Sequence, residues 1–273
     1  MEHVESQLLF ANIIMKGILF DLDGVLYNSE TLIDGAPETV RWVQARGIPY
    51  LFVTNTSSRG RSALVEKLDR FGIHADKNQI MTPCVAAAEW LRARSEGRTA
   101  LFILPRAREE FVGIDCLPED LETGARYVVI GDLGDAWNFH NLNRAFRLLH
   151  SSLDAELIAL GMTRYWHAHD GLRLDVAPFV TALEHATGKK ALVFGKPSGT
   201  FFNAAVEALR LPASEIVMIG DSIETDVAGA QQSGLKGILL RTGKFRQVDL
   251  QGDIRPDAVL NTICDLPAWW EKH

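Results

Sequence analysis

Residues 18–25 read Ile18-Leu19-Phe20-Asp21-Leu22-Asp23-Gly24-Val25, and this stretch decides the fold. The apolar run that ends at Phe20 predicts a buried strand, and two aspartates one residue apart follow it at once. Because side chains two apart on a strand share a face, Asp21 and Asp23 are expected to project together from its carboxyl end, where open α/β sheets bind ligands. Gly24 lets the backbone turn sharply there. Taken alone, the pattern also fits an Asp-rich turn that binds nothing.

The composition narrows the class of protein. The chain has 273 residues, of which 47% are hydrophobic and 23% are charged, an ordinary balance for a soluble globular protein. Its net charge of −7 argues against nucleic acid or an anionic membrane as a partner, because both require basic surfaces. The three cysteines form no CxxC pair, so neither a zinc knuckle nor a disulfide framework is expected, and a cytoplasmic location is favoured.

Targeting signals are also missing from the pattern. No apolar run reaches the roughly 18 residues that a membrane helix needs. The segment Met1 to Asn12 lacks the basic start and the small-residue cleavage site of a signal peptide. It is equally consistent with a helical extension or with an upstream start codon, so the sequence leaves open whether residues 1–12 belong to the native protein.

Strand-like and helix-like segments alternate along the chain, which predicts βαβ units and a parallel sheet. Residues 13–81 and 189–273 are expected to form one doubly wound core, with a strand over 191–194. Residues 82–188 carry strand-like runs of their own and are expected to form a second α/β domain inserted into the first. These runs cover 101–104, 127–130 and 157–160.

Four apolar runs end in polar residues, and neighbouring parallel strands would bring these residues to one edge of the sheet. They are Asp21 with Asp23, Thr54 with Asn55, Lys196, and Asp221 with Asp226. Mg²⁺ prefers a few carboxylates plus water and phosphate oxygens. Asp21, Asp221 and the carbonyl of Asp23 are therefore the predicted ligands of a metal ion.

The same residues suit phosphoryl transfer. A carboxylate such as Asp21 can attack phosphorus and form an aspartyl-phosphate, while Asp23 stays protonated beside a charged neighbour and donates to the leaving group. Thr54, Asn55, Lys196 and the backbone at Gly24 can hold the phosphoryl oxygens. Each of the four groups also has a purely structural explanation, as a turn, a surface lysine or a helix cap. The occurrence of all four in this order favours a catalytic role.

These motifs resemble those of the haloacid dehalogenase-like (HAD) hydrolase superfamily. The stretches that carry the resemblance are Asp21-Leu22-Asp23-Gly24-Val25, Thr54-Asn55, Gly195-Lys196-Pro197 and Gly220-Asp221-Ser222 with Thr225-Asp226. The long insertion resembles the C2 cap of subfamily IIA, which implies an α/β, Rossmann-like HAD core with an inserted α/β cap. Within that subfamily the chain is most similar to the branch that acts on phospholysine, phosphohistidine and inorganic pyrophosphate.

The resemblance implies roles for single residues. Asp21 would be the nucleophile, Asp23 the general acid and base, and Asp221 a ligand of Mg²⁺, with Asp226 supporting the ligands from behind. Thr54, Asn55 and Lys196 would bind phosphate. It also implies that Mg²⁺ is the cofactor, that the substrate is a small phosphorylated molecule, and that two copies pair through the cap.

The predicted function is therefore Mg²⁺-dependent hydrolysis of a small phosphorylated substrate. Cleavage of a P–N or P–O–P bond is the alternative to cleavage of a phosphomonoester. A phosphomutase fits less well, and a catalytically idle phosphate-binding protein is the alternative from another class. In the cap, Arg164 and Asp175 stand out as substrate contacts or partners of an internal salt bridge, whereas the sequence Trp166-His167-Ala168-His169-Asp170 fits a loop or hairpin better than a metal site.

Overall fold

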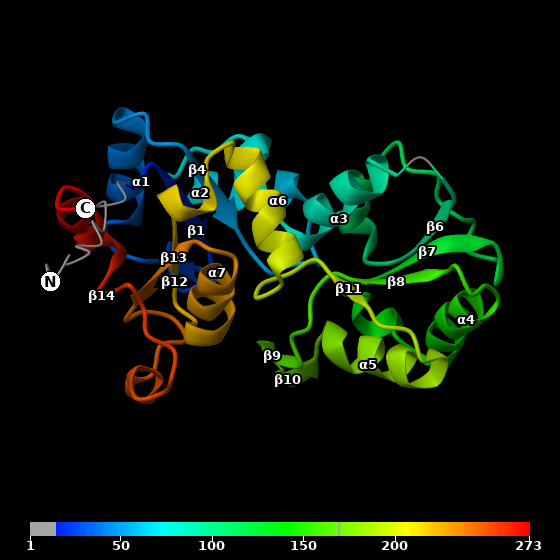
Figure 1. Cartoon of the computed structure of the whole chain (residues 1–273). Coiled ribbons are helices and arrows are strands. Elements are labelled where there is room, and N and C mark those ends of the chain that lie inside the picture. Colours follow the sequence, from blue (N-terminus) through cyan, green and yellow to red (C-terminus); the bar gives the residue numbers. More distant parts are fainter. Residues whose placement is uncertain (1–14, 95, 169) are drawn as a thin grey trace, which may run out of the picture.

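Two parallel β-sheets, each flanked by helices, lie side by side in the computed structural model, which describes residues 15–94, 96–168 and 170–273 (Figure 1). The first sheet has the strand order β14 (Ala258–Leu260), β13 (Lys236–Leu240), β12 (Ile216–Gly220), β1 (Gly17–Asp21), β4 (Tyr50–Val53) and β5 (Ile80–Met81). The second has the order β11 (Leu192–Val193), β8 (Glu156–Ala159), β7 (Ala125–Ile130) and β6 (Arg98–Phe102). The mixed α/β class with parallel sheets is as the sequence predicts.

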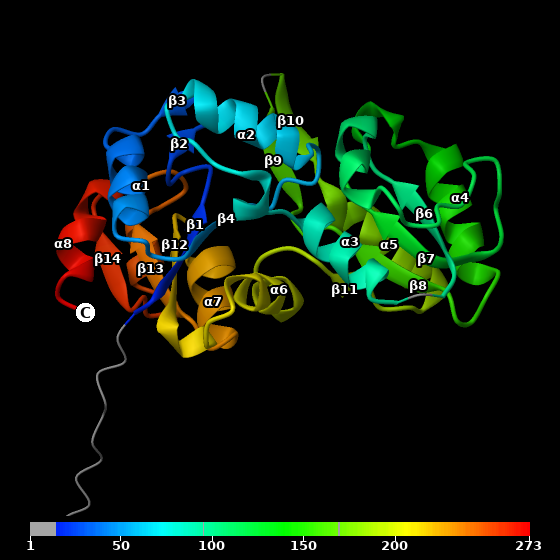
Figure 2. The same cartoon turned by 90° about the horizontal axis from the view of Figure 1, so that it is seen from above.

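Helices cover both faces of the first sheet (Figure 2). One face packs against α1 (Ala36–Ala45), α2 (Arg61–Arg70) and α8 (Leu266–Trp270), and the other against α6 (Gly199–Leu209) and α7 (Gly229–Gln232). On β1 the side chain of Leu19 joins one core cluster, and those of Ile18 and Phe20 join the other. Burial on both faces explains why this strand is a continuous apolar run rather than an alternating one.

The second sheet has the same layered build. Helices α4 (Phe139–His150) and α5 (Val176–Thr187) cover one of its faces, and α3 (Pro83–Arg92) covers the other. Helix α3 belongs to a core cluster that also holds Phe201 and Phe202 of α6, so one apolar core runs from the first sheet to the second. Two antiparallel hairpins complete the fold: β2 (Tyr27–Asn28) with β3 (Thr31–Leu32), and β9 (Tyr165–Ala168) with β10 (Gly171–Leu174).

The strand predicted over 191–194 belongs to a different sheet from the one expected. Leu192 and Val193 pair with Ile158 and Ala159 of β8, so β11 extends the second sheet and does not join the first. The expected start of the core at residue 189 therefore precedes the point where the chain leaves the second sheet. The physical reason is that a four-residue apolar run suits a buried parallel strand in either sheet, and only the tertiary contacts decide between them.

Two glutamates of the second domain cap helix α2 of the first. The 3₁₀ segment Pro105–Phe111 presents Glu110, whose Oε1 accepts from the Arg61 amide at 2.7 Å and whose Oε2 accepts from Arg61 Nε at 2.9 Å. Glu109 accepts from the Ser62 amide at 3.0 Å. The helix's own N-cap residue, Gly60, has no side chain to do this. The two domains are thus joined by charge-assisted hydrogen bonds as well as by apolar packing.

Replacing the buried glutamate is expected to destabilise the protein measurably. Glu110→Ala leaves the Arg61 amide and the Arg61 guanidinium without their acceptor, and we expect a loss of about 3 kcal/mol in the free energy of unfolding. Urea denaturation measures it. Glu109→Ala is the matched control, because Glu109 is more exposed and its loss should cost about 1 kcal/mol. Equal effects of the two variants would contradict this account.

Among the described residues no helix is long and apolar enough to cross a membrane.

Candidate active site

The polar residues predicted from the sequence meet at one edge of the first sheet. Asp21 is the last residue of β1, Thr54 follows β4, and Asp221 follows β12. These strands are parallel neighbours, so their carboxyl ends lie together. Lys196 comes from the chain that leaves the second sheet. Two residues before it, the Phe194 amide still donates to the Ala159 carbonyl of β8.

Lys196 lies between two buried carboxylates. Its Nζ is 2.8 Å from Asp21 Oδ1 and 2.7 Å from Asp226 Oδ1. Asp21 is 6% exposed, Lys196 4% and Asp226 0%. Charged groups are seldom buried this deeply unless they are paired. The arrangement therefore fixes all three side chains, and above all the oxygen of Asp21 that faces the lysine.

The carboxylate of Asp226 is used up by protein contacts. Besides the ion pair with Lys196, its Oδ2 accepts from the amides of Asp221 at 3.2 Å and Ser222 at 3.0 Å. A Cβ at Gly220 would lie 2.3 Å from this carboxylate, so only glycine allows the close approach. Asp226 thus holds the loop after β12, which agrees with a supporting position behind Asp221.

One oxygen of Asp221 is left for a ligand. Asp221 Oδ2 accepts from the Lys244 amide at 2.7 Å, whereas Oδ1 is buried and has no hydrogen-bond partner among the described residues. Oxygens of Asp21, Asp221 and Asp226 lie within 4.8 Å of one another. An orphaned buried oxygen beside other carboxylates fits a hard cation, which takes oxygen ligands. Because Asp226 is already committed, Asp21 and Asp221 are the side chains that fit an ion.

The electrostatics of the cluster favour a further positive charge. Burial raises the pKa of Asp21 to about 7; the charge of Lys196 opposes this effect, and those of Asp226 and Asp221 add to it. Burial also raises the pKa of Asp221. For Lys196, burial favours the neutral amine, but the charges of Asp21 and Asp226 outweigh it and raise the pKa of the ammonium group. Three carboxylates around one cation repel one another, and a bound cation would relieve that repulsion.

Asp23 has different surroundings from Asp21, which lies two residues before it. Strand β1 ends at Asp21, the chain turns at Leu22, and the side chain of Asp23 is exposed. Its Oδ1 accepts from the Ser29 amide at 3.2 Å. The two carboxylates consequently have different environments, one buried and paired and the other open to solvent.

The residues predicted to hold phosphate differ in what their groups already contact. Thr54 is buried, and its hydroxyl accepts from the Thr56 amide at 3.3 Å. The side chain of Asn55 is bound to the backbone of Lys196, with Nδ2 2.9 Å from the carbonyl oxygen and Oδ1 2.7 Å from the amide nitrogen. Asn55 thus positions Lys196. Any contact of its own with phosphate would have to come from its backbone or from the remaining capacity of the amide group.

Gly24 matters to the site because it has no side chain to collide with Asp221. Its amide donates to the Tyr27 carbonyl at 2.7 Å, which differs from the expectation that this amide would hold phosphate. The residue has a φ of +90°, and a Cβ here would lie 1.9 Å from Asp221 Oδ2. Only glycine therefore lets the turn after β1 approach Asp221.

The loop after β13 is a part of the site that the sequence analysis did not assign. Thr242 donates from its hydroxyl to the Gly24 carbonyl, and the Lys244 amide donates to Asp221. A Cβ at Gly243 would lie 2.1 Å from Asp221 Oδ2. One signal was present, since the apolar run Gly237–Leu240 ends at the same sheet edge. The contacts themselves are made largely by backbone groups, which leave no trace in residue type.

The cap residues singled out in the sequence have structural places. Trp166 and Asp170 belong to the β9–β10 hairpin, while His169 lies outside the described residues. Arg164 is exposed. Asp175 is the N-cap of α5, where its side chain accepts from the Val176 amide at 2.9 Å. These contacts explain Asp175 without a substrate.

Asp175 should make the stability of the cap depend on pH. Burial raises its pKa to about 6, so the fold holds the neutral form better and loses stability as pH rises from about 4 through 6. Asparagine caps helices equally well and carries no charge. We expect Asp175→Asn to raise the melting temperature at pH 7.5 by roughly 2–4 °C and the gain to vanish near pH 4. Thermal denaturation at both pH values checks this, with exposed Asp154→Asn as the control; a gain that did not shrink at low pH would contradict it.

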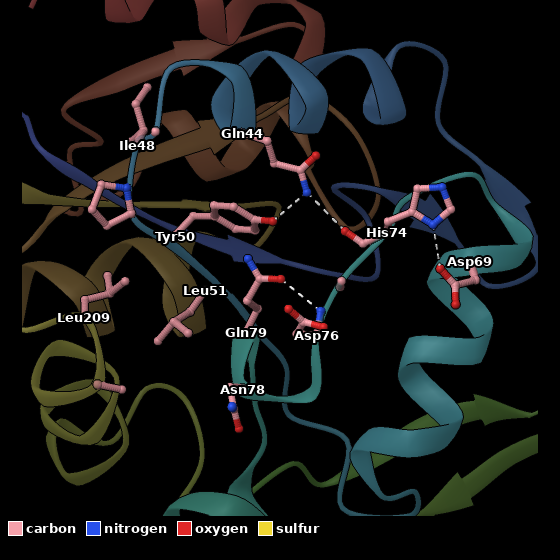
Figure 3. Close-up of a pocket in the computed structure, with 14 residues that line it drawn as sticks. Gln44, Ile48, Tyr50, Leu51, Asp69, His74, Asp76, Asn78, Gln79 and Leu209 are labelled. Carbon is pink, nitrogen blue, oxygen red and sulfur yellow. Dashed lines mark hydrogen bonds and ion pairs between the residues drawn. The ribbon is translucent and has the colours of Figure 1, made fainter.

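A groove lies at the opposite edge of the first sheet (Figure 3). It has a volume of about 850 Å³ and is lined at the start of β4 by Gln44, Tyr50, His74 and Gln79. The Tyr50 hydroxyl accepts from Gln44 Nε2 at 2.8 Å. Strand β4 begins at Tyr50 and ends at Val53 beside the acidic cluster, so this groove is separate from the candidate active site.

The fold and site together define a doubly wound α/β protein with a carboxylate–lysine–carboxylate centre and an acidic pair fit for a cation. Comparison with known proteins agrees. The family model described as haloacid dehalogenase-like hydrolase matches residues 18–115, and one described as HAD-hydrolase-like matches residues 193–266.

Relatives match over nearly the whole chain. Human phospholysine phosphohistidine inorganic pyrophosphate phosphatase is 39% identical over 256 residues, which cover 92% of each protein. The bovine haloacid dehalogenase-like hydrolase domain-containing protein 2 is 38% identical over 86% of this chain and 87% of its own. Among solved structures, p-nitrophenyl phosphatase from Archaeoglobus fulgidus superposes with a TM-score of 0.84 at 28% identity, covering 95% of this chain and all of the other.

The chain belongs to the haloacid dehalogenase-like hydrolase family, within subfamily IIA, and is an enzyme of the phosphatase class.

Proposed function

We propose that the protein is a Mg²⁺-dependent phosphatase that hydrolyses a small phosphorylated substrate through an aspartyl-phosphate on Asp21. The observation that carries this proposal is the geometry of Asp21. Its Oδ1 takes both the Leu22 amide and Lys196, each at 2.8 Å, which leaves Oδ2 as the oxygen to attack phosphorus. The charge of Lys196 lowers the pKa of Asp21 against the effect of burial and so favours the ionised carboxylate, which is the reactive form.

The two aspartates divide the chemistry. In the first step Asp21 Oδ2 bonds to phosphorus, the bond from phosphorus to the leaving group breaks, and Asp23 gives its proton to that group. In the second step Asp23 takes a proton from water, the water oxygen bonds to phosphorus, and the bond to Asp21 breaks to release phosphate. The exposed position of Asp23 supports this role, because it must meet both the leaving group and water.

Asp21, Asp221 and the backbone carbonyl of Asp23 would hold the metal ion. When bound, Mg²⁺ offsets the negative charge of the phosphoryl group. Thr54, the Asn55 backbone and Lys196 would orient the phosphoryl oxygens from the other side. The unpartnered oxygen of Asp221 supports this assignment.

The leaving group separates the candidate substrates. A phosphomonoester is supported by the similar fold of the archaeal p-nitrophenyl phosphatase, and a P–N or P–O–P bond by the name of the human relative. An idle phosphate-binding protein is disfavoured, because Asp21, Asp23, Lys196 and Asp221 are all present. Pairing of two copies through the cap and a cytoplasmic location stay predictions.

Removal of the metal is expected to abolish turnover. We expect phosphate release from at least one member of a panel with Mg²⁺, and a loss of about 10³-fold or more with EDTA that Mg²⁺ restores. The panel holds sugar phosphates, nucleotides, phosphoglycolate, pyridoxal phosphate, pyrophosphate and a phosphoramidate. Activity unchanged by EDTA would refute the role of the metal. A well-folded protein that releases no phosphate from any compound would favour the idle binder.

A further inference from the structure

The tip of the β2–β3 hairpin holds the carboxylate of Asp23. The Ser29 amide, at this tip, donates to Asp23 Oδ1 at 3.2 Å. Ser29 has a φ of +51°, a left-handed conformation that is uncommon for a residue with a side chain. Such a conformation persists only where surrounding contacts impose it. The orientation of Asp23 therefore depends on whatever fixes this hairpin.

A buried lysine of helix α2 fixes the hairpin. Lys67 is 6% exposed, and its Nζ lies 3.2 Å from Oε1 of Glu30, the residue after Ser29. The same Nζ lies 4.1 Å from the centre of the Tyr27 ring, at the start of the hairpin. The Tyr27 ring in turn packs against that of Phe71, with centroids 5.5 Å apart. Figure 2 shows the hairpin lying beside α2.

The arrangement is unusual in its burial. Glu30 is exposed, yet the lysine that binds it is not, so the ion pair alone does not account for a desolvated ammonium group. The face of the Tyr27 ring supplies the remaining attraction as a cation–π contact. The Lys67 side chain thus contacts the hairpin at Tyr27 and at Glu30, on either side of the Ser29 amide that binds Asp23.

We propose that Lys67 is a positioning residue for Asp23: by gripping Tyr27 and Glu30, it sets the hairpin tip and aims the carboxylate at the leaving group. The inference rests on the proposed function, because it assigns the consequence of the grip to the proton transfer by Asp23. Among the described residues, the contacts of Lys67 are with Glu30 and Tyr27 and do not include Asp21, Lys196, Asp221 or Asp226. Its effect should therefore scale with how much the leaving group needs a proton.

Two aryl phosphates of nearly the same shape test this. p-Nitrophenolate is a stable anion and leaves with little help, whereas phenolate from phenyl phosphate is more basic and leaves better with a proton. We expect Lys67→Met to lower kcat/KM about tenfold on phenyl phosphate and less than about threefold on p-nitrophenyl phosphate. Lys67→Arg should restore the wild-type ratio, because it keeps the cation over the ring. Asp23→Asn is the reference variant: it should also lower kcat/KM more on phenyl phosphate than on p-nitrophenyl phosphate, and by a larger factor than Lys67→Met.

Controls keep the outcomes distinct. Lys16→Met removes another lysine paired with a glutamate, 2.9 Å apart and remote from the hairpin, and should leave both rates unchanged. Glu30→Gln, at an exposed position, should show the same selective loss at about threefold, which covers the case that Lys67→Met does not fold. Equal losses on both substrates, or none, would overturn the inference while leaving the proposed function intact. A well-folded wild-type protein that hydrolyses neither these two compounds nor any member of the panel with Mg²⁺ would overturn both.

Discussion

The Asp21→Asn variant is expected to lose at least about 10⁴-fold in kcat and to remain folded. The amide oxygen of asparagine is too weak a nucleophile to form a bond to phosphorus, and the carboxylates of Asp226 and Asp221 are held in place by other contacts. Asp226 is tied to Lys196 and two amides, and Asp221 accepts from Lys244. Phosphate release with Mg²⁺, on the best substrate of the panel, measures the loss.

The fold should survive this change because the two side chains have the same shape. Asparagine can still accept from the Leu22 amide and from Lys196 through its Oδ1, and Lys196 keeps its ion pair with Asp226. Asp253→Asn, a change of the same kind at an exposed position, is the control and should keep full activity. Near-normal turnover by Asp21→Asn, with wild-type circular dichroism, would refute Asp21 as the nucleophile.

Strands that are buried on both faces could be predicted from the sequence, because they appear as apolar runs that end in polar residues. This holds for β1, β4 and β12, whose last residues place Asp21, Thr54 and Asp221 at one edge. It does not hold for β11, since the same kind of run fits either sheet. Lys196 nevertheless reaches the site, because the chain crosses back immediately after that strand.

Contacts made by the backbone could not be predicted. The Lys244 amide bonds to Asp221 whatever side chain it carries, and the backbone that the Asn55 side chain binds belongs to Lys196, far away in the sequence. The contact of Asp23 with the Ser29 amide was also beyond the pattern, since it depends on where β1 stops and on a hairpin six residues further on. Residue chemistry thus identified the reacting groups, while their aim depends on tertiary structure.

Replacement of Lys196 by methionine is expected to damage stability and activity together. The change keeps the length of the side chain but leaves Asp21 and Asp226 buried without their cation. Removing one partner from a buried charge network costs about 3–5 kcal/mol, so we expect a loss of that size in the free energy of unfolding, measured in EDTA at pH 8. Turnover with Mg²⁺ should fall about 10³-fold, because Asp21 then loses the charge that favours its ionised form and orients it.

A double variant separates the two effects. In Lys196→Met with Asp226→Asn, one of the two stranded carboxylates becomes neutral, so at least about 1 kcal/mol of the lost stability should return. Activity should not return, because Asp21 still lacks its cation. Lys190→Met is the matched control at a position with an 88% exposed side chain, and it should change neither quantity. If Lys196→Met were as stable as the wild type, the buried charges would have to be neutralised by some other group. If the double variant regained turnover, Lys196 would act only as a counter-ion for Asp226 and not on Asp21.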